Sequence, residues 1–90
     1  MRKDELSVSI WRMMRKWVPR GNSAEVCDMD ADLVAEVGID SVGLVQTILE
    51  IEREFGIVIG DDELSGELLR RFSNVVDLVS KKIDETDRPS

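Results

Sequence analysis

The chain has 90 residues, enough for one domain with a modest hydrophobic core. Its hydrophobic content is 42% but its aromatic content only 4%, which favours a small helical bundle over a sandwich of strands. The formal net charge of -7 is uneven, since residues 21–64 carry twelve acids against a single arginine. This acidic centre argues against nucleic-acid binding and favours basic protein partners.

The first predicted helix covers residues 4–17. Apolar residues recur at helical steps on one face: Leu6, Ile10, Met13 and Trp17. Trp11 and Met14 widen this face, and the pattern ends before Pro19. A basic amphipathic helix could lie on a membrane, but this one begins with acids, so we expect it to pack in a bundle. No apolar run is long enough for a membrane span or a signal peptide, and we expect a cytoplasmic protein without a membrane partner.

Residues 18–40 are predicted to form a long loop. A connection of this length within a small domain is unusual and is often functional. We expect Leu33, Val34 and Val37 to hold the loop against the core.

The second predicted helix covers residues 41–55. Asp40 or Ser41 is suited to cap its start, and Gly56 supplies the stop. The apolar positions at helical steps are Val45, Ile48, Ile51 (or Glu52) and Phe55.

Two further helices are predicted after a packed loop at residues 56–60. A short helix covers about residues 62–70 and carries Leu64, Leu68 and Leu69. The last helix covers about residues 75–84, with Asn74 as its cap and Asp77 reaching back to complete a capping box, and residues 85–90 are expected to be frayed. The predicted fold is therefore all-α: a single domain, residues 1–90, forming a small antiparallel bundle of three main helices plus one short helix.

Ser41 is the most distinctive candidate for chemistry, but it has no base to activate it. The chain contains no histidine, and "GIDSVG" does not match the nucleophile-elbow spacing because the preceding glycine is three positions away rather than two. These observations exclude hydrolysis by Ser41 itself. We expect no catalytic residues.

A metal site is also disfavoured. Asp28, Asp30 and Asp32 fit the first, third and fifth positions of a calcium-binding EF-hand loop, but Leu33 replaces its glycine and Ile39 its last glutamate. Cys27 is the only cysteine, so a disulfide within the chain is impossible.

A serine at the start of a helix has two interpretations. It can be a simple cap, which is common, or it can accept a phosphate group that a separate enzyme attaches, because helix N-termini favour anions. In the second interpretation, Asp40 could help to hold a divalent ion during the transfer.

The segment "DADLVAEVGIDSVGLVQTILEIEREFGIVIGDDEL" resembles the core of acyl carrier and peptidyl carrier proteins. The family pattern is an acid, an apolar residue, Gly, any residue and then Asp-Ser-Leu. It is met from Glu36 to Ser41, and Val42 stands in place of the usual Leu. A helix ending in Glu54-Phe55 and an acidic turn follow, and "FSNVVDLVSKKI" resembles the family's last helix. The resemblance covers about residues 30–83.

This resemblance implies that a phosphopantetheinyl transferase attaches 4′-phosphopantetheine from coenzyme A to Ser41, supported by Asp40. The thiol of the arm would bear an acyl or aminoacyl group as a thioester. The protein would then be a non-catalytic carrier and a substrate of this transferase. Its other partners would be an adenylating or acyl-loading enzyme and a downstream synthase or transferase.

The second helix departs from fatty-acid carriers, which usually place acids in its first half. Here that half is apolar and neutral, which favours a specialised pathway of the polyketide or nonribosomal-peptide kind. We expect Val42 and Leu49, two turns apart, to be a partly exposed docking pair, with Gln46, Glu50 and Arg53 beside them; the alternative is that the pair belongs to the core.

The overall prediction is a discrete, monomeric carrier protein. The alternative from another class is an adaptor or regulatory module that keeps the fold but is never modified. The intact Asp40-Ser41 pair favours the carrier.

Overall fold

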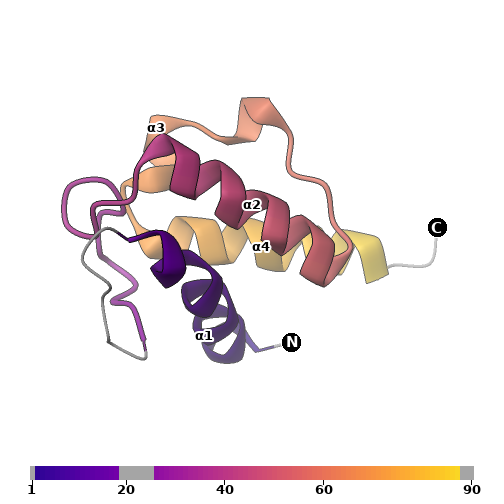
Figure 1. The fold of residues 1–90 in the computed structure, drawn as a ribbon. Coiled ribbons are helices and arrows are strands. Elements are labelled where there is room, and N and C mark those ends of the chain that lie inside the picture. The colour runs from indigo at the N-terminus through magenta and orange to yellow at the C-terminus, as the bar shows by residue number, and fades with distance from the viewer. Residues whose placement is uncertain (1, 19–25, 88–90) are drawn as a thin grey trace.

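The computed structural model describes residues 2–18 and 26–87, and within them every regular element is helical. The elements are α1 (Lys3–Met14), a 3₁₀ turn η1 (Arg15–Trp17), α2 (Ser41–Phe55), a 3₁₀ turn η2 (Asp61–Glu63), α3 (Gly66–Leu69) and α4 (Phe72–Asp87). Figure 1 shows α1 running in the opposite sense to α2 and α4. This arrangement confirms the predicted all-α fold with three main helices and a short one.

Helix α1 and η1 together match the helix predicted for residues 4–17. Leu6, Ile10 and Met13 are buried as expected. Trp17, however, is 40% exposed and so does not belong to the buried face. The reason is the change to 3₁₀ geometry after Met14, because three residues per turn shift the phase of the side chains around the axis.

Helix α2 begins and ends where local sequence signals place it. Asp40 is the N-cap, and its Oδ1 accepts a hydrogen bond from the Gly43 N–H at 2.7 Å. Gly56 ends the helix in the left-handed conformation at φ 64°, with its N–H bonded to the Glu52 carbonyl. Both signals lie within a few residues of the helix, so the predicted bounds of 41–55 are correct.

Three predictions about the last helix are wrong. Helix α4 begins at Phe72 rather than after Asn74, because the N–H groups of Phe72 and Ser73 donate to loop carbonyls at 2.9 and 2.8 Å. The Asn74 side chain donates to the Glu67 carbonyl at 3.0 Å, and Asp77 pairs with Lys3 at 2.9 Å, so no capping box forms. The helix also continues to Asp87, beyond the expected end at residue 84.

The predicted short helix at residues 62–70 is two separate pieces, η2 and α3. Leu64 and Ser65 interrupt it, and the Ser65 hydroxyl caps α3 by accepting from the Leu68 N–H at 3.3 Å. Residues 56–60 form the expected packed loop, in which Ile57 and Ile59 are buried. The C-terminal part of this loop is held by α2, since the Glu52 carboxylate accepts from the Ile59 N–H at 2.8 Å.

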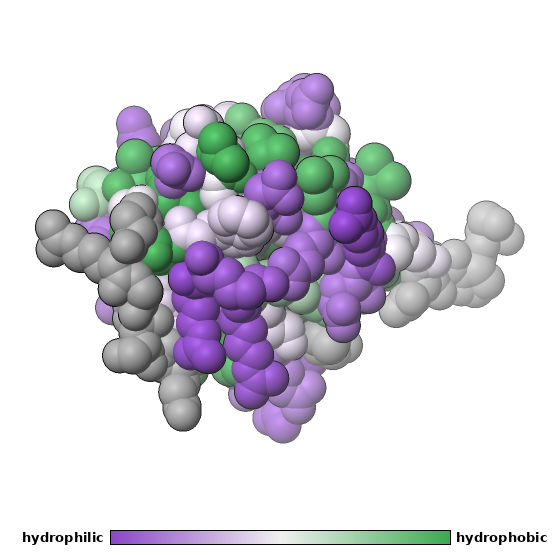
Figure 2. Space-filling model, in the orientation of Figure 1, coloured by the Kyte–Doolittle hydropathy of each residue, from purple (hydrophilic) through white to green (hydrophobic). Residues whose placement is uncertain are grey.

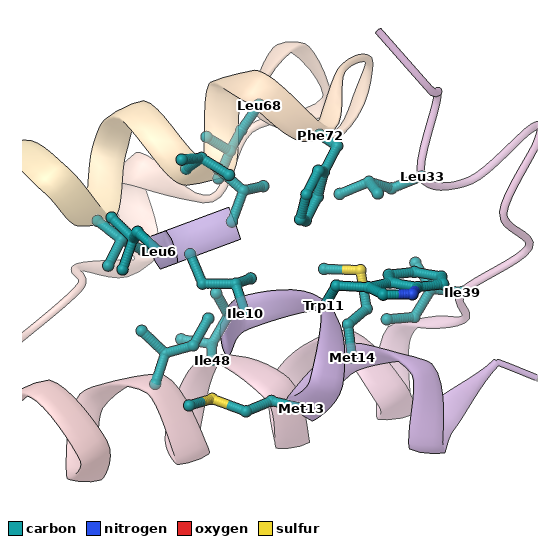
Figure 3. Packing of buried hydrophobic residues seen from close by; sticks show 14 of the residues in the cluster. Leu6, Ile10, Trp11, Met13, Met14, Leu33, Ile39, Ile48, Leu68 and Phe72 are labelled. Carbon is teal, nitrogen blue, oxygen red and sulfur yellow. The ribbon is translucent and has the colours of Figure 1, made fainter. Parts of the chain in front are cut away.

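The core is built from all the main helices and from the long loop. Trp11 of α1 and Phe72 of α4 meet edge to face, with ring centroids 6.3 Å apart and an interplanar angle of 76°. Figure 3 shows the buried side chains converging on this region, including Leu33 from the loop. The loop therefore contributes to the core as well as connecting two helices.

The described part of the loop is bonded to the junction between α3 and α4. The Leu33 N–H donates to the Leu69 carbonyl at 2.9 Å, and the Phe72 N–H donates to the Ala31 carbonyl at 2.9 Å. Leu33 is fully buried and Val37 is half-buried, as predicted, but Val34 is 55% exposed. The prediction for Val34 is wrong. An irregular loop has no periodicity in its sequence that would indicate which side chains face the core and which face solvent. Pro19 and Gly21 lie outside the described residues.

Candidate functional site

Ser41 is exposed and is the first residue of α2. The residues before it fix its position: Gly38 turns the chain at φ 83°, a left-handed conformation that favours glycine. Ile39 is buried, and its N–H donates to the Leu33 carbonyl at 3.0 Å. Asp40 then caps the helix. The hydroxyl is thus presented outward from a backbone that is anchored on both sides.

The start of a 15-residue helix also gives this site its electrostatic character. Aligned peptide dipoles place partial positive charge at the helix N-terminus, where anions are favoured. The Asp40 carboxylate already satisfies one N–H group of this first turn, that of Gly43. A phosphate attached to Ser41 would lie at the positive end of α2.

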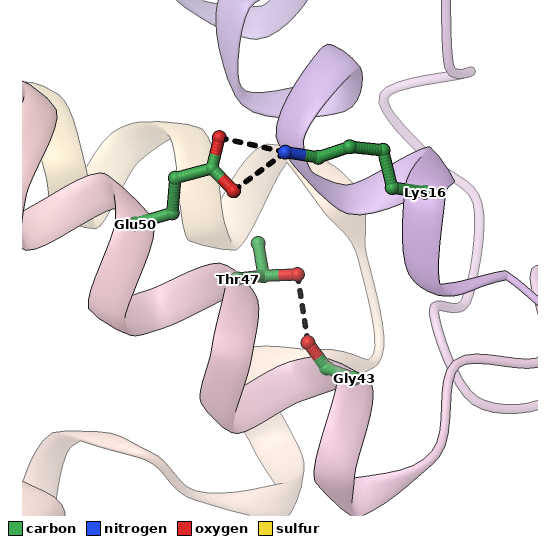
Figure 4. A network of polar contacts seen from close by, with 4 residues as sticks. All are labelled: Lys16, Gly43, Thr47 and Glu50. Carbon is green, nitrogen blue, oxygen red and sulfur yellow. Dashed lines mark hydrogen bonds and ion pairs between the residues drawn. The ribbon is translucent and has the colours of Figure 1, made fainter.

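One flank of α2 is packed tightly against η1 just behind Ser41. Gly43 is buried, and a Cβ added there would lie 2.8 Å from the Trp17 Cβ. Thr47 is fully buried, and its hydroxyl donates to the Gly43 carbonyl at 2.8 Å (Figure 4). One turn further on, Lys16 Nζ lies 2.8 and 3.0 Å from the two carboxylate oxygens of Glu50. This flank of α2 is therefore occupied by contacts with η1.

The outward face of α2 carries an exposed apolar stripe. Val42 is 63%, Val45 51% and Leu49 40% exposed, at positions i, i+3 and i+7. Figure 2 shows hydrophobic residues gathered along the upper part of the molecule, above a band of hydrophilic ones. The predicted exposure of Val42 and Leu49 is confirmed, whereas Val45, which the helical pattern assigned to the buried side, is open to solvent.

The other three predicted docking residues differ in their surroundings. Gln46 and Arg53 are exposed on α2 close to the stripe. Glu50 is half-buried in its ion pair with Lys16, so its carboxylate is already engaged within the chain. Sequence periodicity could have identified Val45, because Val42, Val45 and Leu49 share one face.

Two hollows adjoin Ser41. The inner hollow, about 260 Å³, lies toward the loop and α3 and is lined by Val34, Ile39, Asp40, Ser41, Leu44 and Leu69. The outer hollow, about 270 Å³, is shallower and is lined by Ser41, Val42, Val45 and Gln46 of α2. Both linings are largely apolar.

Two acids of the long loop, Asp28 and Asp32, stabilise turns by accepting hydrogen bonds from nearby backbone N–H groups. Asp28 Oδ1 accepts from the Asp30 N–H at 2.9 Å. Asp32 Oδ1 accepts from the N–H groups of Val34 and Ala35 at 2.9 and 2.8 Å. Across residues 2–18 and 26–87, no three His, Cys, Asp or Glu side chains are grouped in a way that could hold a metal ion.

Cys27 is poorly suited to act as a nucleophile. Burial, with smaller contributions from Asp28 and Glu36, raises the pKa of its thiol to about 11. The thiol is therefore protonated at neutral pH, and the reactive thiolate is scarce.

Among the helices of residues 2–18 and 26–87, none is long and apolar enough to cross a bilayer.

Comparison with known proteins identifies a family for this region. The family model described as "Phosphopantetheine attachment site" matches residues 21–80. An acyl carrier protein of Nitratidesulfovibrio vulgaris (strain DP4) is 36% identical over 62 residues, covering 69% of this chain and 79% of the relative. An acyl carrier protein of Petrotoga mobilis is 36% identical over 59 residues, covering 66% and 67%. One of Rickettsia bellii (strain RML369-C) is 27% identical over 62 residues, covering 69% and 70%. No solved structure gives a significant match.

The residues around Ser41 fit a phosphate-linked arm. Ser41 is exposed, the helix terminus favours a phosphate, and apolar hollows lie beside Ser41. The arm, when attached, supplies a thiol that can carry a group as a thioester. The side chains of this chain supply only its anchorage and surroundings.

Proposed function

The chain belongs to the phosphopantetheine-attachment family of carrier proteins, and from this premise we propose that it carries an acyl or aminoacyl group on an arm attached to Ser41. The observation that supports Ser41 most directly is its exposed hydroxyl at the start of α2, immediately after the capping Asp40. The protein acts as a carried substrate rather than as a catalyst.

The attachment is a phosphoryl transfer performed by a phosphopantetheinyl transferase. The Ser41 oxygen forms a new bond to the phosphorus that bears the pantetheine of coenzyme A. The pyrophosphate bond breaks, and 3′,5′-ADP leaves, while the transferase accepts the serine proton. Asp40 supports the reaction by fixing the start of α2 through the Gly43 N–H and by helping to hold a divalent ion in the complex.

The outward face of α2 is the proposed docking surface for partner enzymes. It combines Val42 and Leu49 with Gln46, Arg53 and the additional Val45. Glu50 lies on the same helix, but its carboxylate pairs with Lys16 and is therefore not a free charge for a partner to bind. Partners in this scheme are the transferase, an adenylating or acyl-loading enzyme and a downstream synthase or transferase. A flexible arm raises the effective concentration of its cargo at each of them.

The apolar character of this surface favours a specialised pathway, of the polyketide or nonribosomal-peptide kind, over housekeeping fatty-acid synthesis. Exposed apolar patches commonly mark protein interaction sites. We further propose that the protein works as a monomer in the cytoplasm, where coenzyme A and such enzymes are available.

The decisive experiment is loading followed by intact mass measurement. The protein is incubated with coenzyme A, magnesium and a broad-specificity phosphopantetheinyl transferase. We expect a mass gain of one phosphopantetheine, which Ser41→Ala abolishes. Ser65→Ala is the matched control, because Ser65 is also an exposed serine at the start of a helix, and it should still be loaded. Absence of any gain in the wild type would favour the alternative, an unmodified adaptor with the same fold.

A further inference from the structure

A third hollow, which we call the α1 hollow, lies on the outer side of α1. It measures about 240 Å³ and is lined by Val8, Arg12, Arg15 and Val26. Val8 and Arg12 are four residues apart, so they lie one turn apart on one face of the helix, and the core residues Leu6 and Ile10 lie on the opposite face. The α1 hollow shares no described residue with the two hollows that adjoin Ser41.

The α1 hollow is a basic site on an acidic protein. The chain has a net charge of -7, but residues 3–17 carry four Lys or Arg against two acids. The ammonium groups of Lys3 and Lys16 already pair with acids of α4 and α2. Arg12, in contrast, is exposed and forms no ion pair within residues 2–18 and 26–87. Its guanidinium can therefore receive an anionic group from outside the chain, and Arg15 adds positive charge beside it.

Acids near the start of α1 limit the kind of anion that fits. Asp4 and Glu5 precede Arg12 by eight and seven residues, which is about 10–12 Å along the helix axis. This separation exceeds the Debye length of about 8 Å at physiological ionic strength, so a single carboxylate on Arg12 is largely screened from both acids. An extended polyanion, such as a nucleic acid or an anionic lipid surface, would cover the acids as well and would be repelled by them.

Two valines give the α1 hollow an apolar part. Val8 is half-buried and Val26 is 61% exposed. A free inorganic anion would bind a guanidinium group without covering either valine, whereas an aliphatic side chain next to a carboxylate would remove their apolar surface from water. The volume of about 240 Å³ is below the range of about 300–1,000 Å³ usual for pockets that enclose a small ligand, and it suits two neighbouring side chains of a protein.

We propose that the α1 hollow binds an acidic segment of a partner protein. A Glu or Asp carboxylate of that segment pairs with Arg12, and an aliphatic side chain one helical turn away covers Val8 and Val26. The inference goes beyond the proposed carrier function and does not depend on attachment to Ser41. Because the α1 hollow and the apolar stripe of α2 share no described residue, a segment seated on α1 leaves the stripe uncovered. The chain can then hold one protein through α1 while α2 meets another.

Titration of the isotope-labelled protein with a designed peptide tests this proposal by nuclear magnetic resonance. The probe is a short alanine-based amphipathic peptide that carries Glu and Leu one helical turn apart. We expect saturable shift changes at the residues of the α1 hollow, with binding that weakens as the salt concentration rises. Replacing the peptide's Glu by Gln, or its Leu by Ala, should each weaken binding.

Three results of this titration would overturn the proposal. The first is the absence of any saturable change up to about 5 mM peptide. The second is that inorganic phosphate produces the same shift changes as strongly as the peptide, which would make the hollow a site for any anion. The third is that phosphatidylglycerol vesicles do so, which would make α1 a membrane-binding surface.

Two pairs of variants supply the controls. Arg12→Gln should raise the Kd of the peptide about three- to fivefold, whereas Arg71→Gln, at another exposed arginine, should leave it unchanged. Val26→Ser should raise the Kd about threefold, whereas Val58→Ser should not; the two valines are 61% and 77% exposed, so both variants should remain folded. Equal effects within either pair would refute the proposed contacts. Loading of Ser41 is measured separately by intact mass, so failure of peptide binding and failure of attachment are distinguishable.

Discussion

Substitution of Gly43 by alanine tests the packing that positions Ser41. An added Cβ would lie 2.8 Å from the Trp17 Cβ and 3.2 Å from both Asp40 Oδ1 and Ile39 Cγ1. The nearest atom adjoins the backbone of η1, so it cannot rotate away as the end of a long side chain could. Relief of the contact requires η1 or the first turn of α2 to move.

The expected magnitude is a balance of two effects. Overpacking of this kind costs about 1–3 kcal/mol. Replacing glycine by alanine inside a helix recovers roughly 0.5–1 kcal/mol of intrinsic propensity. From the midpoints of these two ranges we expect the free energy of unfolding of Gly43→Ala to fall by about 1 kcal/mol, which for a domain of this size lowers Tm by roughly 4–8 °C.

Urea unfolding followed by circular dichroism measures this change. Gly66→Ala is the matched control, because no atom lies within 4 Å of a Cβ added there and Gly66 is also in the first turn of a helix. Gly66→Ala should be neutral or slightly stabilising. If Gly43→Ala proved as stable as the wild type, close packing of η1 on α2 would be refuted as the reason for glycine at this position.

Two further predictions concern the loops. Glu52→Ala removes the acceptor of the Ile59 N–H and should cost about 1 kcal/mol, with faster amide exchange at Ile59; unchanged exchange there would contradict the role of this hydrogen bond. Cys27, with its pKa raised to about 11, should be alkylated more slowly in the folded than in the urea-unfolded protein at pH 8. Equal alkylation rates in the two states would argue against this shift. Because the pKa of the Cys27 thiol is higher in the folded than in the unfolded protein, its contribution to stability is present below pH 9 and is lost as the pH rises toward 11.

Features of this fold that depend on residues close together in the sequence could be predicted, whereas features that depend on contacts between distant residues could not. The bounds of α2 were predictable because Asp40 and Gly56 act within a few residues. The start of α4 was not, since the N–H groups of Phe72 and Ser73 find their acceptors in a loop some forty residues earlier. The position of Ser41 at the start of a helix could be predicted from a local motif. The inner hollow depends on the contact between the loop and α3, which no spacing in the sequence reveals.

The acids of α2 show how the fold determines the character of the proposed docking surface. Glu50 binds Lys16 and Glu52 accepts the Ile59 N–H, so two carboxylates that a sequence would count as surface charge serve internal contacts. The outward face is left with the stripe of Val42, Val45 and Leu49, beside which Gln46 and Arg53 are exposed. Attraction to a partner at this face must therefore come mainly from burial of apolar area, which salt does not screen, rather than from the protein's net charge of -7. In the proposed docking, the acidity of the chain would speed encounter with a basic partner, and the residues beside Ser41 would select that partner by shape and apolarity.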